Sequence, residues 1–297
     1  MRATASGFLG RAARASFGFA LGLGLCLGLC LLAWFGAQAP AWAAASASVQ
    51  LDDLTSDELR ARIVGGATTV LLPVGGTEQN GPHMALGKHN VRVRLLAERI
   101  AQQLGDAIAA PVLAYVPEGR ITPPTQHMRW AGTLSVPEPA FEGLLAGAAR
   151  SLRAHGFCHI VLLGDHGGYR QSFDRVAALV NREWAASSNC RVHTLPEYYR
   201  AAAAGYAQML KSQGYTAAEI GTHAGLADTA LTLALDPALV RTDKLARAAT
   251  AQHPDNGVAG DPAKATAELG RAGVELIVKS TVAAVRAAVQ PAVQPAR

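Results

Sequence analysis

Residues 69–90 have the sequence TVLLPVGGTEQNGPHMALGKHN and contain the pattern that decides the fold. The apolar run 69–74 lies between the glycine pairs Gly65-Gly66 and Gly75-Gly76, which is typical of a buried β-strand. The apolar run 159–163 leads in the same way into Gly164-Asp165-His166-Gly167-Gly168. Both predicted strands therefore end in glycine-rich segments that carry polar side chains.

Helical patterns alternate with predicted strands along the chain. We expect strands at 69–74, 107–116, 159–163 and 191–195, and helices at about 91–104, 140–155 and 171–186. This alternation predicts βαβ units, and hence an α/β fold in which one domain holds a parallel-rich β-sheet flanked by helices on both faces. The segment 117–137 is rich in proline, glycine, threonine and histidine and is too long for a simple connection, so it predicts an active-site loop.

The composition is that of one globular domain with little excess charge. The chain has 297 residues, of which 50% are hydrophobic and 16% are charged, enough for the core of one α/β domain. Three of the 27 basic residues, Arg2, Arg11 and Arg14, lie in an N-terminal segment without acidic residues, which leaves 24 basic against 22 acidic residues, a net charge of +2. Basic clusters with interleaved aromatic residues are absent, so we expect no nucleic-acid partner.

Residues 1–43 are typical of an export signal. The three arginines precede an apolar run from Phe17 to Phe35, and small residues surround Ala41-Trp42-Ala43. We expect cleavage after Ala43 and a mature chain, 44–297, that is periplasmic or secreted and has no stable membrane span. The alternative is an uncleaved N-terminal membrane anchor, because the apolar run approaches the length of a membrane span if it extends to Ala39.

Cys158 and Cys190 are the cysteines of the expected mature chain, and each lies just before a predicted strand. In an oxidising compartment a disulfide bond between them would persist. Two buried free thiols are the alternative, because the sequence does not give the distance between the two side chains.

Polar residues gather at the ends of the predicted strands, where ligands bind in open parallel sheets. Glu78 and His89 follow the first strand, and His166 follows the strand at 159–163. A carboxylate and two imidazoles from separate strand ends are the usual protein ligands of a catalytic zinc or iron ion. A later pair, His223 and Asp228, can face the same site only if His223 precedes the first turn of the helix that begins there. The alternative for this pair is a histidine and an aspartate that cap the helix.

The order of these motifs resembles the creatininase family from about Val70 to Leu235. Members carry a Glu-x-His-Gly-x-His-Leu-Pro-x-x-x-Asp loop, an Asn-Gly-His-Gly-Gly-Asn type strand end and a His-Ala-Gly-x-x-Glu-Thr segment. A fourth motif in the same order is Gln126-His127-Met128-Arg129-Trp130-Ala131-Gly132-Thr133-Leu134-Ser135. The resemblance implies a creatininase-like domain over 44–297, assembly as a homo-oligomer, often a hexamer, and cleavage of cyclic amides, formamides or peptide-like amides with one or two divalent metals.

Three positions depart from the family pattern. Asn80 stands in place of a ligand histidine, His89 in place of a bridging aspartate, and Gly168 in place of a glutamate ligand of creatininase. A carboxylate has two oxygens to share between two cations, whereas a neutral imidazole binds one metal through one nitrogen. The resemblance together with these departures therefore predicts one metal ion per chain.

The leading hypothesis is an amidohydrolase in which Glu78, His89 and His166 bind zinc, with manganese or iron as alternatives. The cation would lower the pKa of a bound water, and the resulting hydroxide would attack a small-molecule amide. His223 or Asp228 would then move the proton to the leaving nitrogen.

Further residues near these motifs receive supporting roles. His127 would bind substrate or cover the site, and Asp165 would orient His166. The roles of Asn80 and His83 are left open.

Two other functional classes compete with this hypothesis. Asn80, His89 and Gly168 favour a noncatalytic ligand-binding protein with a degenerate metal site, although the retained Glu78 and His166 argue against loss of the site. An oxygen-using iron enzyme rests only on the count of two histidines and one carboxylate. The identity of the substrate depends on the walls of a pocket, which motifs do not report.

Overall fold

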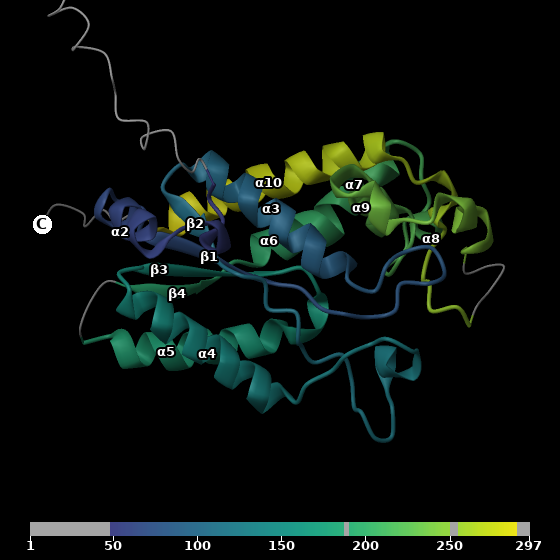
Figure 1. Ribbon diagram of the computed structural model, residues 1–297. Helices are drawn as coiled ribbons and strands as arrows, with labels where there is room; N and C mark the ends of the chain where they lie inside the picture. Colours follow the sequence, from purple (N-terminus) through teal and green to yellow (C-terminus); the bar gives the residue numbers. More distant parts are fainter. Residues whose placement is uncertain (1–47, 187–189, 250–254, 290–297) are drawn as a thin grey trace, which may run out of the picture. The chain divides into compact units, whose positions relative to one another are not determined.

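Four parallel strands form the central sheet of the protein, which is described by a computed structural model over residues 48–186, 190–249 and 255–289 (Figure 1). The strands are β1 (Thr69–Val74), β2 (Ala107–Ala109), β3 (His159–Gly164) and β4 (Arg191–Thr194), in the order β2-β1-β3-β4. The predicted α/β fold with a parallel sheet is confirmed. The expected signal peptide, 1–43, lies outside the described residues.

Helices cover both faces of the sheet because side chains alternate between the faces along each strand. Leu71, Val161 and Leu163 point to one face and pack in one core cluster, whereas Val70 and Leu72 belong to a second cluster on the other face. Figure 1 shows α4 and α5 below the sheet and α3, α6 and α10 above it. The helices are α2 (Ser56–Val64), α3 (Lys88–Leu104), α4 (Glu138–Ala154), α5 (Arg170–Trp184), α6 (Pro196–Arg200), the π-helix η5 (Ala201–Gly205), α7 (Tyr206–Ser212), α8 (Ala217–Ile220), α9 (Leu226–Leu235) and α10 (Ala267–Val289).

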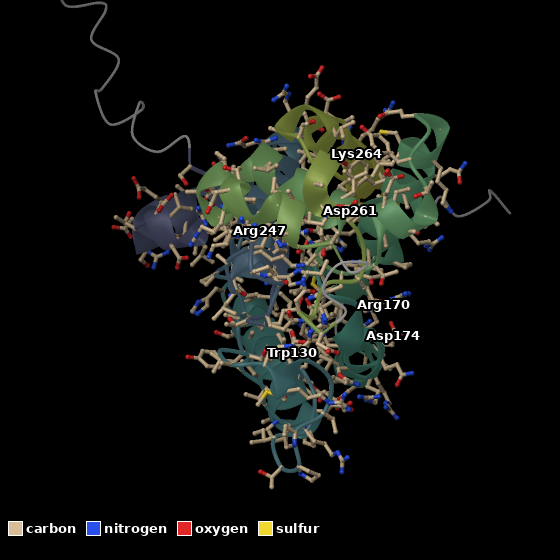
Figure 2. The ribbon with its side chains drawn as sticks, turned by 90° about the vertical axis from the view of Figure 1, so that its right-hand side faces the viewer. Trp130, Arg170, Asp174, Arg247, Asp261 and Lys264 are labelled. Atoms are coloured by element: carbon tan, nitrogen blue, oxygen red, sulfur yellow. A yellow bond between two sulfur atoms is a disulfide. The ribbon has the colours of Figure 1, made fainter. Side chains whose placement is uncertain are left out.

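Short 3-10 turns connect several of these elements. They are η2 (Leu51–Asp53), η3 (Gln126–Arg129), η4 (Gly167–Tyr169), η6 (Pro237–Leu239), η7 (Thr242–Arg247) and η8 (Pro262–Lys264). Figure 2 shows Trp130, at the end of η3, in the lower half of the view and Lys264 of η8 in the upper half. None of the described helices is both long and apolar enough to cross a membrane.

The strand predicted at 107–116 is shorter than expected. β2 ends at Ala109, and beyond it one bridge between Val74 and Leu113 keeps the chain beside β1. Pro111 has no N–H to donate to a strand ladder, so regular pairing stops before it. The long segment that follows starts, like the loops after β1 and β3, at the carboxyl edge of the sheet.

A disulfide bond joins Cys158 and Cys190, whose Cα atoms are 4.4 Å apart. The two cysteines precede β3 and β4, which are neighbours with His159 opposite Arg191. The parallel pairing of β3 with β4 therefore brings the two cysteines close together, which the sequence alone could not show.

Candidate metal centre and active site

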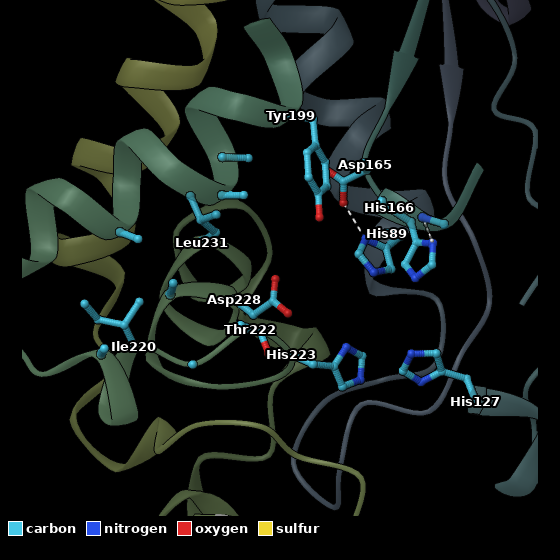
Figure 3. A pocket seen from close by; sticks show the side chains of 18 of the residues that line it. His89, His127, Asp165, His166, Tyr199, Ile220, Thr222, His223, Asp228 and Leu231 are labelled. Atoms are coloured by element: carbon cyan, nitrogen blue, oxygen red, sulfur yellow. Dashed lines mark hydrogen bonds and ion pairs between the residues drawn. The ribbon is translucent and has the colours of Figure 1, made fainter. Parts of the chain in front are cut away.

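Pairing of β1 with β3 brings the two strand-end motifs together. Val74 lies opposite Gly164, so the loop that carries Glu78 and the turn that carries His166 leave the sheet side by side. His89 is the second residue of α3, and His127 lies in η3 of the long segment. His223 precedes α9, as its proposed role requires, because the helix begins at Leu226. Figure 3 shows His89, His127, His166 and His223 around one pocket.

Glu78 is the centre of this group, and its side chain is fully buried. Its Oε1 lies 2.7 Å from His89 Nε2, and its Oε2 lies 3.3 Å from His127 Nε2 and 3.5 Å from His166 Nε2. Burial by itself would raise the pKa of Glu78, but the nearby imidazoles of His166 and His89 hold that pKa well below its usual range. Glu78 is therefore an anion, and its Oε2 accepts no hydrogen bond from any described residue.

Glu78, His127 and His166, here called the metal cluster, offer ligand atoms that all lie within 4.8 Å of one another. Ligands about 2.1 Å from a common tetrahedral zinc ion lie about 3.4 Å apart. The separations of 3.3 and 3.5 Å from Glu78 Oε2 match that spacing. Although burial opposes the charged imidazolium, the nearby carboxylates of Glu78 and Glu118 raise the pKa of His166. The cluster thus attracts positive charge.

His89 is held between two carboxylates, Glu78 and Asp165. Its Nδ1 lies 2.6 Å from Asp165 Oδ2, in addition to the contact between Nε2 and Glu78. The 2.7 Å separation from Glu78 Oε1 is that of a hydrogen bond and is shorter than the spacing of ligands on one zinc ion. Asp165 was predicted to orient His166. It contacts His89 instead, and it also accepts hydrogen bonds from Arg92 and Tyr198.

Asp228 lies against two basic side chains. Its Oδ2 accepts from Lys88 Nζ at 2.7 Å and its Oδ1 from Arg92 Nη1 at 2.8 Å, and the N–H of Ala224 also donates to it. Burial would raise the pKa of Asp228, but Lys88 and Arg92 hold it well below the usual range. The carboxylate anchors the start of α9 and both cations.

His223 faces both Glu78 and the pocket. Its Nε2 lies 2.9 Å from the carbonyl oxygen of Gln79, to which it donates, and its Nδ1 lies 3.6 Å from Glu78 Oε1. Burial lowers the pKa of His223 to about 4, so the ring is neutral at pH 7. Gln79 Nε2 lies 3.1 Å from His127 Nδ1 and also donates to the carbonyl oxygen of Gly257, which positions the neighbouring ring.

Asn80 and His83 support the loop rather than face the metal cluster. Asn80 Nδ2 donates to the carbonyl oxygens of Glu78 and Ala85, which closes the loop on itself. His83 is fully buried and bonds through Nε2 to the hydroxyl of Thr229 at 3.0 Å.

Three further charged residues of the site, Lys88, Arg92 and Glu118, were not predicted from the sequence. Lys88 immediately precedes His89 at the start of α3, and Arg92 follows it one helical turn later, a spacing that places both on the site face. Glu118 follows Pro117 at the sheet edge where the other polar residues gather. Lys88 and Arg92 lie on the helix face that is otherwise mostly apolar. Charged side chains are rarely buried without a partner, so this pattern could have indicated a site.

A cavity of about 590 Å³ opens beside these residues (Figure 3). One wall carries the polar side chains of His89, His127, His166, His223 and Asp228. The segment 202–231 forms the opposite wall. Its lining residues are mostly small or apolar, namely Ala202, Ala203, Ala207, Ala217, Ile220, Ala227 and Leu231, and Lys211 and Thr222 add two polar side chains. Such a cavity can hold a small molecule with an apolar part next to the metal cluster.

Comparison with known proteins agrees with this geometry. The family model for creatininase, described as creatinine amidohydrolase, matches residues 52–285. Creatinine amidohydrolase of Pseudomonas putida is 29% identical over 204 residues, which cover 67% of this chain and 76% of that protein. Mycofactocin precursor peptide peptidase of Mycobacterium tuberculosis (strain ATCC 25618 / H37Rv) is 27% identical over 246 residues, or 75% of this chain and 84% of the relative.

Solved creatininase structures have the same fold. A mutant creatininase described as Zn-Zn type superposes with a TM-score of 0.68 at 28% identity, covering 83% of this chain and 100% of the other. A structure titled creatininase Mn has a TM-score of 0.68 at 27% identity, with 82% and 100% covered. The family match spans most of the chain, and this protein belongs to the creatininase family of amide-cleaving hydrolases.

Proposed function

We propose that the protein is an amidohydrolase that depends on one divalent cation bound by Glu78, His127 and His166. The supporting observation is the buried metal cluster, in which Glu78 Oε2 lies at ligand spacing from two imidazoles and accepts no hydrogen bond within the described part of the chain. A buried carboxylate oxygen that accepts no hydrogen bond is destabilising unless a cation compensates it. Zinc is the first candidate and manganese the second, because related structures are named for these metals.

When bound, the cation supplies Lewis acidity, which polarises an amide carbonyl and activates water for attack on it. The protein residues position the reaction. His89 holds Glu78 through Oε1, and Asp165 fixes the ring of His89 from the other side. This chain of hydrogen bonds keeps the Glu78 carboxylate in one orientation.

His223 is the better candidate for proton transfer to the leaving nitrogen. Its Nε2–H is committed to the Gln79 carbonyl oxygen, so Nδ1 carries the lone pair near Glu78, and the ring lines the pocket. Asp228, the other residue predicted for this role, is tied to Lys88 and Arg92 and would have to leave both before it could carry a proton.

We also propose a substrate class and a location. The alanine-rich wall of the cavity favours a small amide or peptide-like amide with an apolar group beside the scissile bond, and the relatives include a creatinine amidohydrolase and a precursor peptide peptidase. Export to an oxidising compartment is supported by the Cys158–Cys190 disulfide bond and by the signal-like sequence 1–43. A hexameric assembly remains a proposal from the family resemblance.

Metal analysis together with an amide-hydrolysis assay tests this function. Protein purified without chelators should contain about one metal ion per chain, and should lose amine release from a panel of cyclic and linear amides after chelation and regain it with Zn²⁺ or Mn²⁺. His166→Ala should lose metal and activity. His155→Ala is the matched control, because His155 is exposed at the end of α4 and should retain both.

The outcomes separate the functional classes. A folded wild-type protein with neither metal nor amide hydrolysis would contradict this proposal and favour the noncatalytic binding protein. About two ions per chain would contradict the one-metal assignment.

A further inference from the structure

Glu118 is a buried carboxylate that the proposed site has not yet used. Its side chain is fully buried, and neither Oε1 nor Oε2 accepts a hydrogen bond from the residues that the structure describes. A carboxylate in this position is destabilising unless another group compensates it.

The carboxylate points to the metal cluster through His166. Glu118 Oε2 lies 3.4 Å from His166 Nε2, and Glu78 Oε2 lies 3.5 Å from the same nitrogen. Both distances are close to the spacing of about 3.4 Å between ligands of one zinc ion. Glu118 lies outside the group of residues whose ligand atoms are all within 4.8 Å of one another, so its carboxylate would have to shift toward Glu78 and His127 to bind the same ion. Two buried carboxylate oxygens thus flank one imidazole nitrogen, and each lacks a hydrogen bond from the described residues.

The local backbone holds Glu118 in this position. Ser135 Oγ accepts a hydrogen bond from the N–H of Glu118 and donates to the carbonyl oxygen of Gly119, so one side chain clamps both sides of the residue. At Gly76, whose φ is +156°, a Cβ would lie 2.6 Å from Glu118 Oε1. A glycine at 76 therefore leaves the room that the carboxylate occupies.

Charge balance among the described residues of the site also favours a cation. Asp228 pairs with Lys88 and Arg92, and Asp165 also pairs with Arg92. Once these two permanent cations are matched to the two aspartates, Glu78 and Glu118 remain, with Lys88 3.9 Å from Glu78 and His166 3.4 Å from Glu118. One divalent cation would balance two ionised carboxylates that lie beside neutral imidazoles.

We propose that Glu118 is a fourth protein ligand of the cation, beside Glu78, His127 and His166. The cation would then need a fifth coordination position for the water or amide of the proposed reaction. This inference rests on the proposed function, because it requires a metal in the cluster. In this proposal the segment 117–137 contributes two ligands, Glu118 and His127, and is part of the metal centre.

The variant Glu118→Gln tests the proposal because it keeps the shape of the side chain and removes the charge. Zinc affinity of the metal-free protein is measured by competition with a chromophoric chelator, and the rise in Tm on adding Zn²⁺ is measured in parallel. We expect the Kd for Zn²⁺ to increase at least about tenfold, since even groups that only orient ligands contribute about 10–100-fold. The metal-free variant should be at least as stable as the metal-free wild type, because a neutral amide replaces a buried carboxylate that accepts no hydrogen bond from the described residues.

Glu138→Gln is the matched control, since Glu138 is an exposed glutamate of the same region that pairs with Arg175. It should keep the zinc affinity of the wild type. The visible spectrum of the Co²⁺ protein gives a second readout, and it should change in Glu118→Gln and stay unchanged in Glu138→Gln. These measurements do not depend on the substrate.

Two results would overturn the inference, and only the second would also overturn the proposed function. If the wild type binds one ion and Glu118→Gln binds it with the same affinity and the same Co²⁺ spectrum, Glu118 is not a ligand and the proposed function stands. If the folded wild type binds neither Zn²⁺ nor Mn²⁺, the proposed function and this inference fail together.

Discussion

His89 and His127 are the two candidates for one ligand position of the proposed metal site. His89 was predicted as a ligand from the sequence, whereas the geometry places His127 with Glu78 and His166. His89 contacts Oε1 of Glu78 at hydrogen-bond distance, and His127 contacts Oε2 at ligand distance. The two side chains therefore act on different oxygens of the same carboxylate.

Substitution of each histidine by alanine distinguishes their roles. We expect His127→Ala to lose most of the bound metal and His89→Ala to retain one weakly bound ion, with affinity reduced about 10–100-fold as for a group that orients a ligand. Equilibrium dialysis followed by elemental analysis measures both. Complete loss of metal in His89→Ala with full retention in His127→Ala would support the ligand set predicted from the sequence instead.

Lys88 stabilises the fold as well as the site. Its side chain is fully buried, and its Nζ lies 2.7 Å from Asp228 and 3.9 Å from Glu78. We expect Lys88→Met to lower the free energy of unfolding by about 3–5 kcal/mol, because breaking a buried ion pair leaves an uncompensated charge. Urea denaturation measures the change, with Arg99→Met on the exposed side of α3 as the control. A loss below about 1 kcal/mol would show that Arg92 alone compensates Asp228.

Among the secondary-structure elements, β3 and β4 are linked by a disulfide bond between the residues that precede them. The Cys158–Cys190 bond spans a sequence separation of 32 and so limits the freedom of α5 and its connections in the unfolded chain. For a loop of this length the chain-entropy model gives about 3–4 kcal/mol. We expect the Cys158→Ala/Cys190→Ala protein to lose stability of that order in urea denaturation. An equal stability of the reduced and oxidised wild type would contradict this expectation.

The same strand pair carries a pH-sensitive contact. His159 Nδ1 lies 3.1 Å from His193 Nε2, and burial, with His159 as the next cause, lowers the pKa of His193 to about 4 from its ordinary 6.5. Because the folded state disfavours the protonated ring, this contribution to stability is complete above pH 6.5 and is lost as the pH falls toward 4.

His193→Gln should therefore reduce the dependence of stability on pH between about 6.5 and 4. Denaturation midpoints across this range give the slope for both proteins. The pKa values of His83 and His223 are lowered in the same way, so the stability of the variant should still depend on pH to some extent. Identical slopes would mean that His193 is not held neutral in the folded protein.

For the molecule as a whole, we predict that an N-terminal segment is removed by cleavage. We expect the mature protein to begin near Ala44, because an arginine-flanked apolar run ends there in small residues. Mass spectrometry of protein isolated from its native cell envelope checks the N-terminus. An intact Met1 would contradict cleavage and support the membrane anchor.

The order of elements and the positions of Glu78, His166 and His223 followed from local patterns in the sequence. Hydrophobic runs, glycine pairs and helical periodicity are short-range signals, so they predicted the strands, the parallel sheet and the strand-end motifs. The prediction for the second strand was too long because an apolar run alone does not show where pairing stops, and regular pairing ends at Ala109.

Only the tertiary structure decided which side chains meet. The contact of Glu118 with His166, the place of His127 in the metal cluster and the ties of Asp228 to Lys88 and Arg92 all join residues from different elements. Such contacts depend on the register of β1 against β3 and on the path of the segment 117–137. By itself the sequence determined which chemical groups are present and which strand ends carry them. Their distances, and with them the charge balance of the site, arise from packing between segments far apart in the chain, which local patterns do not encode.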